Sequence, residues 1–174
     1  MDSSALARFE AVVLPHLDAA YTLARYLTRN AHDAEDVVQD ACLRALKYFD
    51  GFRGEAASAR AWLLTIVRNT AHTWRGRQRG DALTTEFDET QHSEAVVDDS
   101  PEGLLLKQDA KHTLDRALEQ LAPEFREVIV LRELEGLSYK EISEVAGVPV
   151  GTVMSRLSRA RARLQEALRE AEGR

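Results

Sequence analysis

Residues 137–164 read LSYKEISEVAGVPVGTVMSRLSRARARL, which is two short amphipathic segments on either side of a glycine. Ser138 can cap the first helix by accepting a hydrogen bond from its first turn, and Gly147 tolerates the left-handed backbone of a tight turn. The second segment carries an apolar stripe that can pack against Ile142 and Val145 of the first. The stripe consists of Val150, Val153, Met154, Leu157 and Leu164. This pattern predicts a helix-turn-helix.

The opposite face of the second helix carries hydroxyl groups and arginines at helical spacing. Its members are Thr152, Ser155, Arg156, Arg159 and Arg163. Guanidinium groups bind phosphates and guanine edges, and short hydroxyls suit phosphates and base edges. A solvated basic face is the simpler alternative. The glycine turn, the interleaved hydroxyls and the local positive charge together favour DNA binding.

The chain of 174 residues has a net charge of −6, but its charges are unevenly distributed. Residues 148–174 contain 6 Lys and Arg against 3 Asp and Glu, whereas residues 78–105 contain 1 against 8. A protein that coats DNA draws its affinity from overall positive charge. We therefore expect a small DNA-binding face and weak affinity for duplex DNA by the chain alone.

The N-terminal half, from Ala5 to about Trp74, has apolar residues at helical spacing and no strand-like alternation. Residues 32–52, HDAEDVVQDACLRALKYFDGF, predict a helix with Asp33 as its N-cap and Gly51 as its end. The apolar face of this helix consists of Ala34, Val37, Val38, Ala41, Cys42, Ala45 and Phe49. The opposite face carries Asp36, Asp40 and Lys47, flanked by Glu35 and Gln39. Phosphate repels carboxylates, so this face suits a basic protein partner, although the helix dipole alone can explain Asp33 and Asp36.

Residues 60–79, RAWLLTIVRNTAHTWRGRQR, predict a second long helix. Its buried stripe consists of Leu63, Ile66, Val67, Thr70 and Trp74. The polar and basic face consists of Thr65, Arg68, Asn69, His72 and Arg75. The periodicity then fails until about Leu104, in an acidic stretch punctuated by glycine and proline, which predicts a linker. The fold class is therefore all-α, with two small helical domains joined by an acidic flexible linker.

Other chemistry is poorly supported by the sequence. Cys42 is the only cysteine, so it forms no internal disulfide or metal knuckle, and the five histidines lack metal-ligand spacing. No glycine-rich phosphate loop or nucleophile-base pair stands out, which argues against an enzyme, a cofactor or a small-molecule substrate. No apolar run could span a bilayer, and the N-terminus is unlike a signal peptide. We expect a cytoplasmic protein without membrane insertion.

The stretch LSYKEISEVAGVPVGTVMSRLSRARARL resembles region 4 of the bacterial extracytoplasmic-function (ECF, group 4) sigma factors of the sigma-70 family. DAEDVVQDACLRAL and AWLLTIVRNTAHTW resemble region 2 of the same family, in the family's order and separation. The resemblance extends from about Phe9 to Leu168, apart from the linker. It implies a region 2 domain in residues 1–77, an acidic linker in 78–105 and a region 4 domain in 106–174.

The resemblance implies a factor that binds core RNA polymerase, directs it to a two-part promoter and helps to open the duplex, in a stress or envelope response. Region 4 reads the upstream promoter element, which assigns DNA contacts to Thr152, Ser155, Arg156, Arg159 and Arg163, with Arg161 as a further phosphate contact. Region 2 reads and melts the element nearer the start site. Its candidates are Phe52, Arg53 and Ser58 in a loop, and Arg68, Asn69, His72 and Arg75 on the following helix. Trp62 and Trp74 are better explained as packing residues.

The resemblance also implies protein partners. The acidic helix, through Asp33, Glu35, Asp36, Gln39 and Asp40, corresponds to the contact with the clamp of the largest polymerase subunit, and region 4 to the contact with the flap region. Anti-sigma factors commonly hold such proteins inactive by wedging between or wrapping around the two domains. The acidic linker would imitate a polyanion in the RNA channel of the polymerase. Ser143 departs from the family, where a small apolar residue is usual.

The main alternative is a stand-alone helix-turn-helix regulator whose N-terminal half dimerises or senses a signal. That alternative predicts tight binding to symmetric duplex sites without polymerase. The small basic face and the negative net charge favour the sigma factor.

Overall fold

The computed structural model describes residues 2–54, 56–81 and 101–173, and every regular element in these ranges is a helix. The N-terminal helices are α1 (Ser3–Val13), η1 (Leu14–His16), α2 (Leu17–Thr28), α3 (Ala31–Tyr48), η2 (Phe49–Gly51) and α4 (Ala56–Asp81). The C-terminal helices are α5 (Pro101–Gln120), α6 (Pro123–Ile129), η3 (Val130–Leu134), α7 (Tyr139–Ala146) and α8 (Val150–Glu172). The all-α prediction is confirmed for the described residues. Helices α4 and α5 extend into both ends of the predicted linker, whose residues 82–100 lie outside the described ranges.

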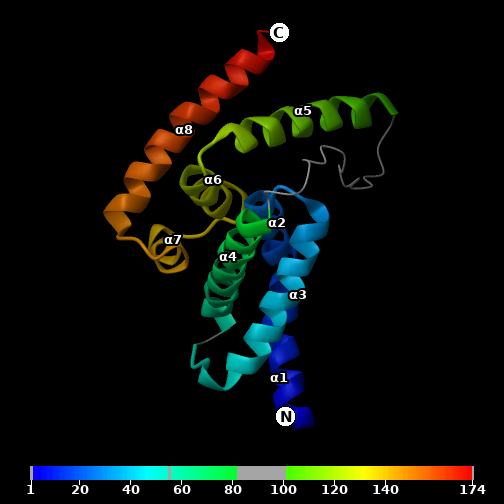
Figure 1. The fold of residues 1–174 in the computed structure, drawn as a ribbon, viewed down its shortest axis with the longest axis vertical. Coiled ribbons are helices and arrows are strands. Elements are labelled where there is room, and N and C mark those ends of the chain that lie inside the picture. The colour runs from blue at the N-terminus through cyan, green and yellow to red at the C-terminus, as the bar shows by residue number, and fades with distance from the viewer. Residues whose placement is uncertain (1, 55, 82–100, 174) are drawn as a thin grey trace.

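Helices α2, α3 and α4 pack against one another in an N-terminal bundle, with α1 alongside (Figure 1). The predicted apolar face of α3 is confirmed, because Ala34, Val37, Ala41 and Ala45 are buried in this bundle. The predicted N-cap is wrong. Asn30, in an extended conformation, accepts a hydrogen bond from the Asp33 backbone N–H at 3.0 Å, so the helix begins at Ala31. An asparagine three residues earlier caps as well as an aspartate, and it precedes the first turn.

Helix α4 is buried on two sides rather than one. The predicted stripe through Leu63, Val67 and Thr70 is buried, but Leu64 and Ala71 are also fully buried. These two residues lie on a second face, and Figure 1 shows α7 packed beside α4. The N-terminal bundle and the C-terminal helices therefore share one continuous hydrophobic core.

Helices α7 and α8 form the predicted helix-turn-helix. Ser138 and Glu141 make a reciprocal capping box at the start of α7, and Gly147 ends that helix with a left-handed backbone at φ 68°. The Ser143 hydroxyl, at the position that departs from the family, donates to the Val148 carbonyl at 2.5 Å and so ties the turn together. Ile142 and Val145 of α7 are buried, as predicted.

Two members of the predicted apolar stripe on α8 do not pack. Val153, Leu157 and Ala160 form the buried face of the helix. Val150 and Met154 are 41% and 53% exposed. The stripe prediction is wrong at these positions because α5, α6 and α7, which pack on α8, bury the arc around Val153 and Leu157 and leave Val150 and Met154 outside it.

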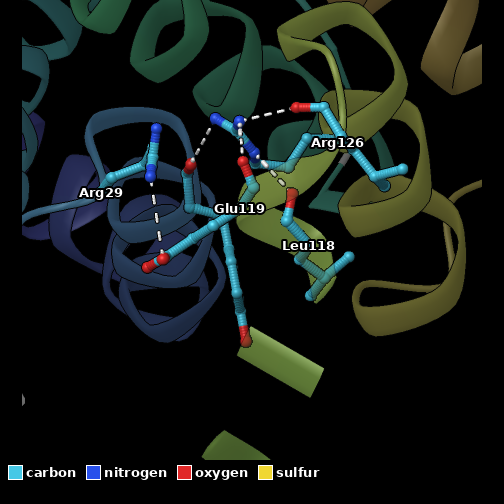
Figure 2. Close-up of polar contacts among 6 residues, drawn as sticks. Arg29, Leu118, Glu119 and Arg126 are labelled. Carbon is cyan, nitrogen blue, oxygen red and sulfur yellow. Dashed lines mark hydrogen bonds and ion pairs between the residues drawn. The ribbon is translucent and has the colours of Figure 1, made fainter. Parts of the chain in front are cut away.

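A buried arginine, Arg126, binds carbonyls at the end of α5 and one carbonyl of the N-terminal bundle (Figure 2). Its guanidinium donates to the carbonyls of Leu118, Glu119 and Leu121 at 2.9, 3.1 and 2.8 Å, and to that of Tyr26 at 3.4 Å. Most of these carbonyls lie in the last turns of α5 and α2, where a helix leaves its C=O groups unpaired. Burial, and then the charges of Arg29 and Arg75, lower the pKa of Arg126 to about 10, so it remains protonated at neutral pH.

Candidate nucleic-acid interface

The exposed face of α8 opposite its buried stripe presents the predicted hydroxyls and guanidiniums. Ser155 and Arg159 are exposed, while Thr152 and Arg156 are half-buried. Neither Arg156 nor Arg159 forms an ion pair with another residue in the described part of the chain, so both guanidiniums are available to an anion. We refer to Thr152, Ser155, Arg156 and Arg159 as the reading face. The structure brings these four predicted residues together along the first three turns of the helix.

The other two predicted contacts of this helix are occupied by protein groups. Arg161 binds Glu133 of η3 through two nitrogens, with Nε to Oε1 at 2.9 Å and Nη2 to Oε1 at 2.8 Å. The guanidinium of Arg163 lies over the Phe125 ring, 4.9 Å from its centroid. Both side chains flank the reading face, and their contact with DNA stays a prediction.

The loop between α3 and α4 is built around an aromatic cluster. Phe52 is half-buried, stacks on Phe49 at a centroid distance of 6.1 Å and lies 4.7 Å from the Trp62 ring. Trp62 therefore packs, as predicted. A side chain at Gly54 would collide with the Ser58 hydroxyl and touch the Phe52 ring, so the glycine lets these two residues lie together. Arg53 beside them is exposed. Ser58 lies in the first turn of α4 rather than in the predicted loop.

The predicted basic face of α4 is divided between solvent and the C-terminal helices. Asn69 and His72 are exposed, whereas Arg68 and Arg75 are half-buried. Arg68 Nε binds Glu127 Oε1 of α6 at 2.7 Å, and the Glu127 side chain is only 2% exposed. This bond uses only Nε of the Arg68 guanidinium, and the carboxylate of Glu127 offsets its positive charge.

Glu127 was missed by sequence reasoning, although it is the only buried acid among the described residues. Its signal is weak, because EFREVIV predicts a helix without saying which side chain meets a partner on α4. Arg60 of α4 makes a second hydrogen bond to the C-terminal part of the chain, because its Nη1 donates to the Glu135 carbonyl at 2.9 Å. Tyr26 adds a third, through its hydroxyl and Asp115 Oδ1 at 2.7 Å. These bonds hold the C-terminal helices against α2 and α4.

Glu127→Gln should lower the free energy of unfolding by about 1 to 2 kcal/mol, because a buried charge-assisted hydrogen bond becomes a neutral one beside a retained arginine. Glu133→Gln is the matched control. It breaks the Arg161 pair, whose side chains are 46% and 49% exposed, and should cost less than about 1 kcal/mol. Urea unfolding followed by circular dichroism gives both values. Equal losses in the two variants would contradict the assigned role of Glu127.

His72 is expected to titrate below its usual pKa of 6.5. Partial burial lowers the pKa of His72, and the charges of Arg68 and Arg75 lower it further, against the opposing effect of Glu127. The folded state thus prefers neutral His72. This contribution to stability is present above pH 6.5 and is lost as the pH falls from 6.5 through the lower pKa of the folded state. NMR titration of the ring protons should show the lowered pKa, and Arg68→Met should raise it. A value at or above 6.5 in the native chain would contradict this account.

Helix α3 packs on α2 and α4 (Figure 1), and its predicted acidic residues lie outside the stripe that is buried. Glu35 and Gln39 are exposed, and Asp33, Asp36 and Asp40 are half-buried. Asp36 lies 3.8 Å from His32, and Asp40 lies 3.4 Å from Arg44. All five predicted residues therefore lie in the first three turns of one helix.

Two apolar side chains on the same helix were missed by sequence reasoning. Leu43 and Tyr48 are 63% and 60% exposed. Leu43 lies three residues after Asp40 and seven after Asp36, which places all three on one face. The sequence did indicate that Leu43 is exposed, because this residue lies outside the predicted apolar face of the helix. The outer face of α3 thus carries the exposed apolar side chain of Leu43 beside its acids.

Among the residues that the structure describes, no helix has both the length and the apolar character needed to cross a membrane. Within the same ranges, His, Cys, Asp and Glu side chains form no group of three that could hold a metal ion.

Comparison with known families matches both halves of the chain. Residues 12–80 match Sigma-70 region 2, and residues 111–164 match Sigma-70, region 4. The RNA polymerase sigma-H factor of Pseudomonas aeruginosa is 36% identical over 167 residues, which cover 92% of this chain and 86% of that protein. The ECF RNA polymerase sigma-E factor of Escherichia coli is 38% identical over 148 residues, 82% of this chain and 76% of that protein. The ECF RNA polymerase sigma factor SigE of Mycolicibacterium smegmatis is 35% identical, and this chain spans 64% of its length.

Solved structures share the arrangement of the whole chain. The sigma factor RpoE, in complex with the anti-sigma factor NepR from Bartonella quintana, has a TM-score of 0.76 and 31% identity, covering 93% of this chain and 97% of that one. CnrH, in complex with the cytosolic domain of CnrY, has a TM-score of 0.63 and 29% identity, covering 93% and 88%. With both regions matched in order, the resemblance seen in the sequence is confirmed. The chain belongs to the ECF sigma factors of the sigma-70 family.

Proposed function

We propose that this chain binds core RNA polymerase through α3, brings it to promoters through α8 and α4, and helps to open the duplex. The observation that carries the proposal is the separation of two unlike surfaces within one chain. The reading face on α8 suits DNA, whereas the outer face of α3 repels it. A protein that must bind polymerase and promoter at once needs both surfaces.

The reading face supports recognition of the upstream promoter element. Arg159 and Ser155 project from the first turns of the second helix of a helix-turn-helix, the part that reaches base edges in the major groove. Arginine can form two hydrogen bonds to guanine, and the hydroxyl can reach a phosphate or a base. Arg156 beside them adds a phosphate contact.

The loop and α4 support recognition of the element nearer the start site. Arg53, Asn69 and His72 are exposed, while Phe52, Arg68 and Arg75 are half-buried. Polar groups beside a small loop suit a base captured from the displaced strand, and basic groups suit its phosphates. The pairing of Arg68 with Glu127 lowers the positive charge that this residue offers to a phosphate, which supports weak DNA binding by the free chain.

The outer face of α3 supports docking on the polymerase. Its acids match a basic partner, and Leu43 and Tyr48 supply apolar area that a solvated face does not need. By family, the partner is the clamp of the largest subunit, with the flap region as the partner of the C-terminal helices. Charge complementarity of this kind sets partner choice and the rate of association.

Regulation by an anti-sigma factor, in the cytoplasm and in a stress or envelope response, is part of the proposal. Its support is that RpoE and CnrH, which share the fold of this chain, were both solved in complexes, the former with an anti-sigma factor. The suggested passage of the acidic linker through the RNA channel concerns residues 82–100, which lie outside the described ranges. Replacing the linker acids with Gln and Ser at constant length tests it through the affinity for core polymerase.

The test is run-off transcription with bacterial core RNA polymerase on a genomic promoter library, with and without the native chain. New start sites that need both components are the expected result. Arg159→Gln should reduce transcription from those sites while leaving core polymerase binding unchanged. Tight binding to a symmetric duplex site without polymerase, and no new start sites, would contradict the proposal in favour of a stand-alone regulator.

A further inference from the structure

Two exposed apolar side chains stand at the start of α8, where sequence reasoning had placed them in the core. Met154 is 53% exposed and Val150 is 41% exposed. They lie one helical turn apart and therefore form a line along the helix. The face of α8 that is buried by the neighbouring helices uses Val153, Leu157 and Ala160 instead. Neither residue thus has a role in the core that would account for its apolar character.

Single exposed apolar residues are ordinary on protein surfaces. The surroundings of this pair are not ordinary, because Ser158, four residues after Met154 and three after Ser155 of the reading face, neighbours both on the helix surface. Both serines are exposed. The apolar line therefore borders the groups that are suited to phosphates and base edges, in the first turns of the helix that enters the groove.

Gly151 provides an independent observation at the same place. A Cβ at this position would meet nothing within 4 Å, so packing within the chain does not require a glycine. Glycine inside a helix costs about 1 kcal/mol relative to alanine. The absent side chain does allow the helix backbone to approach a ligand closely. The turn that carries Val150 and Met154 is thus shaped for close contact with a partner.

The chemistry of the major groove identifies what the pair can contact. Hydroxyl and guanidinium groups account for phosphates and guanine edges, which thioether and isopropyl groups cannot bind. Thymine is the one standard base that presents an apolar group there, its C5 methyl. A methionine side chain is flexible and can follow such a surface closely.

We propose that Met154, with Val150 beside it, contacts thymine methyl groups in the upstream promoter element and so determines part of the promoter specificity. The inference rests on the proposed function, because it requires α8 to lie in the major groove of a promoter. It adds a specific base and a specific atom to that function. The upstream element must then contain a thymine that faces the first two turns of α8.

The test uses holoenzyme assembled from the native chain and bacterial core RNA polymerase, on a promoter found by run-off transcription. Each thymine of the upstream element is replaced, one at a time, by deoxyuridine, which keeps the pairing and hydrogen-bonding edges and removes only the methyl group. Replacing one or two of these thymines should weaken binding about fourfold, as expected for the loss of one buried methyl group. The measured quantity is the ratio of the two dissociation constants, for thymine and for deoxyuridine.

Variants of the chain show whether Met154 causes the ratio. Met154→Ala should bind thymine and deoxyuridine promoters equally at the sensitive position, and Met154→Leu should keep most of the native ratio. Leu106→Ala, which removes a 72% exposed leucine from α5, is the control and should keep the full ratio. A general loss of folding or assembly changes affinity for both promoters and leaves the ratio intact.

The outcomes separate this inference from the proposed function. Polymerase-dependent start sites combined with a ratio of one at every thymine would overturn the inference alone. So would a native ratio in both Met154→Ala and Val150→Ala. If Met154→Ala weakens binding of core polymerase and leaves the ratio unchanged, the pair contacts a protein and the inference is wrong. Absence of any polymerase-dependent start site would overturn the proposed function as well.

Discussion

Replacing Arg126 with methionine should lower the free energy of unfolding by about 3 kcal/mol or more, because it leaves buried carbonyls without a donor. Methionine has a similar length and fills much of the same space, so the loss comes from hydrogen bonds rather than from a cavity. Three carbonyls within 3.1 Å of the guanidinium would lose their donor. Each unpaired buried carbonyl costs on the order of 1 to 3 kcal/mol.

The geometry explains why one side chain has so large an effect. Helix α5 ends at Gln120, and Arg126 reaches back to the carbonyls of Leu118 and Glu119 in its last turn (Figure 2). A positive charge at a helix C-terminus also interacts favourably with the negative end of the helix dipole. The bond to Tyr26 extends the same cap to the last turn of α2. Loss of Arg126 therefore loosens both the end of α5 and its contact with the N-terminal bundle.

Arg29→Met is the matched control, because Arg29 also contacts Glu119 and has the same side-chain type. Its ion pair spans 3.7 Å and its side chain is 43% exposed, so its loss should cost less than about 1 kcal/mol. Urea unfolding of both variants, followed by the helical signal at 222 nm, gives the comparison. A cost below 1 kcal/mol for Arg126→Met, equal to that of the control, would show that these carbonyls need no guanidinium.

The sequence predicts those parts of the fold that depend on local patterns. Ser138 and Gly147 mark the ends of α7, and both predictions are confirmed because a cap and a left-handed turn depend on residues adjacent in the chain. The apolar face of α3 is confirmed for the same reason, since helical periodicity alone decides which residues share a face. The N-cap differs only because Asn30 and Asp33 both have suitable side chains.

Contacts between distant segments could not be predicted in this way. Periodicity shows that Arg68 lies on a polar face of α4 but does not show that Glu127, 59 residues later, meets it. It likewise assigns Val150 and Met154 to an apolar stripe, because it cannot tell how much of the surface of α8 is covered by α5, α6 and α7. The reading face was correctly grouped on one helix face, whereas the engagement of Arg161 and Arg163 by Glu133 and Phe125 depends on how η3 and α6 pack.

The second large effect is expected on α3, where Asp36→Arg combined with Asp40→Arg should weaken binding of core RNA polymerase by on the order of 100-fold or more. The double change moves the charge of one helix face by four units and turns attraction to a basic partner into repulsion. Folding should be little affected, because both carboxylates are surface groups with single partners, His32 and Arg44.

The control separates this local effect from a general change of charge. Glu10→Arg combined with Asp18→Arg makes the same change of charge on exposed positions of α1 and α2. Affinity for core polymerase, measured without DNA, should fall only in the α3 variant, and run-off transcription should be lost with it. Equal losses in both variants would assign the effect to net charge. Unchanged binding in the α3 variant would show that the polymerase docks elsewhere, and the acidic and apolar face of α3 would then need another partner.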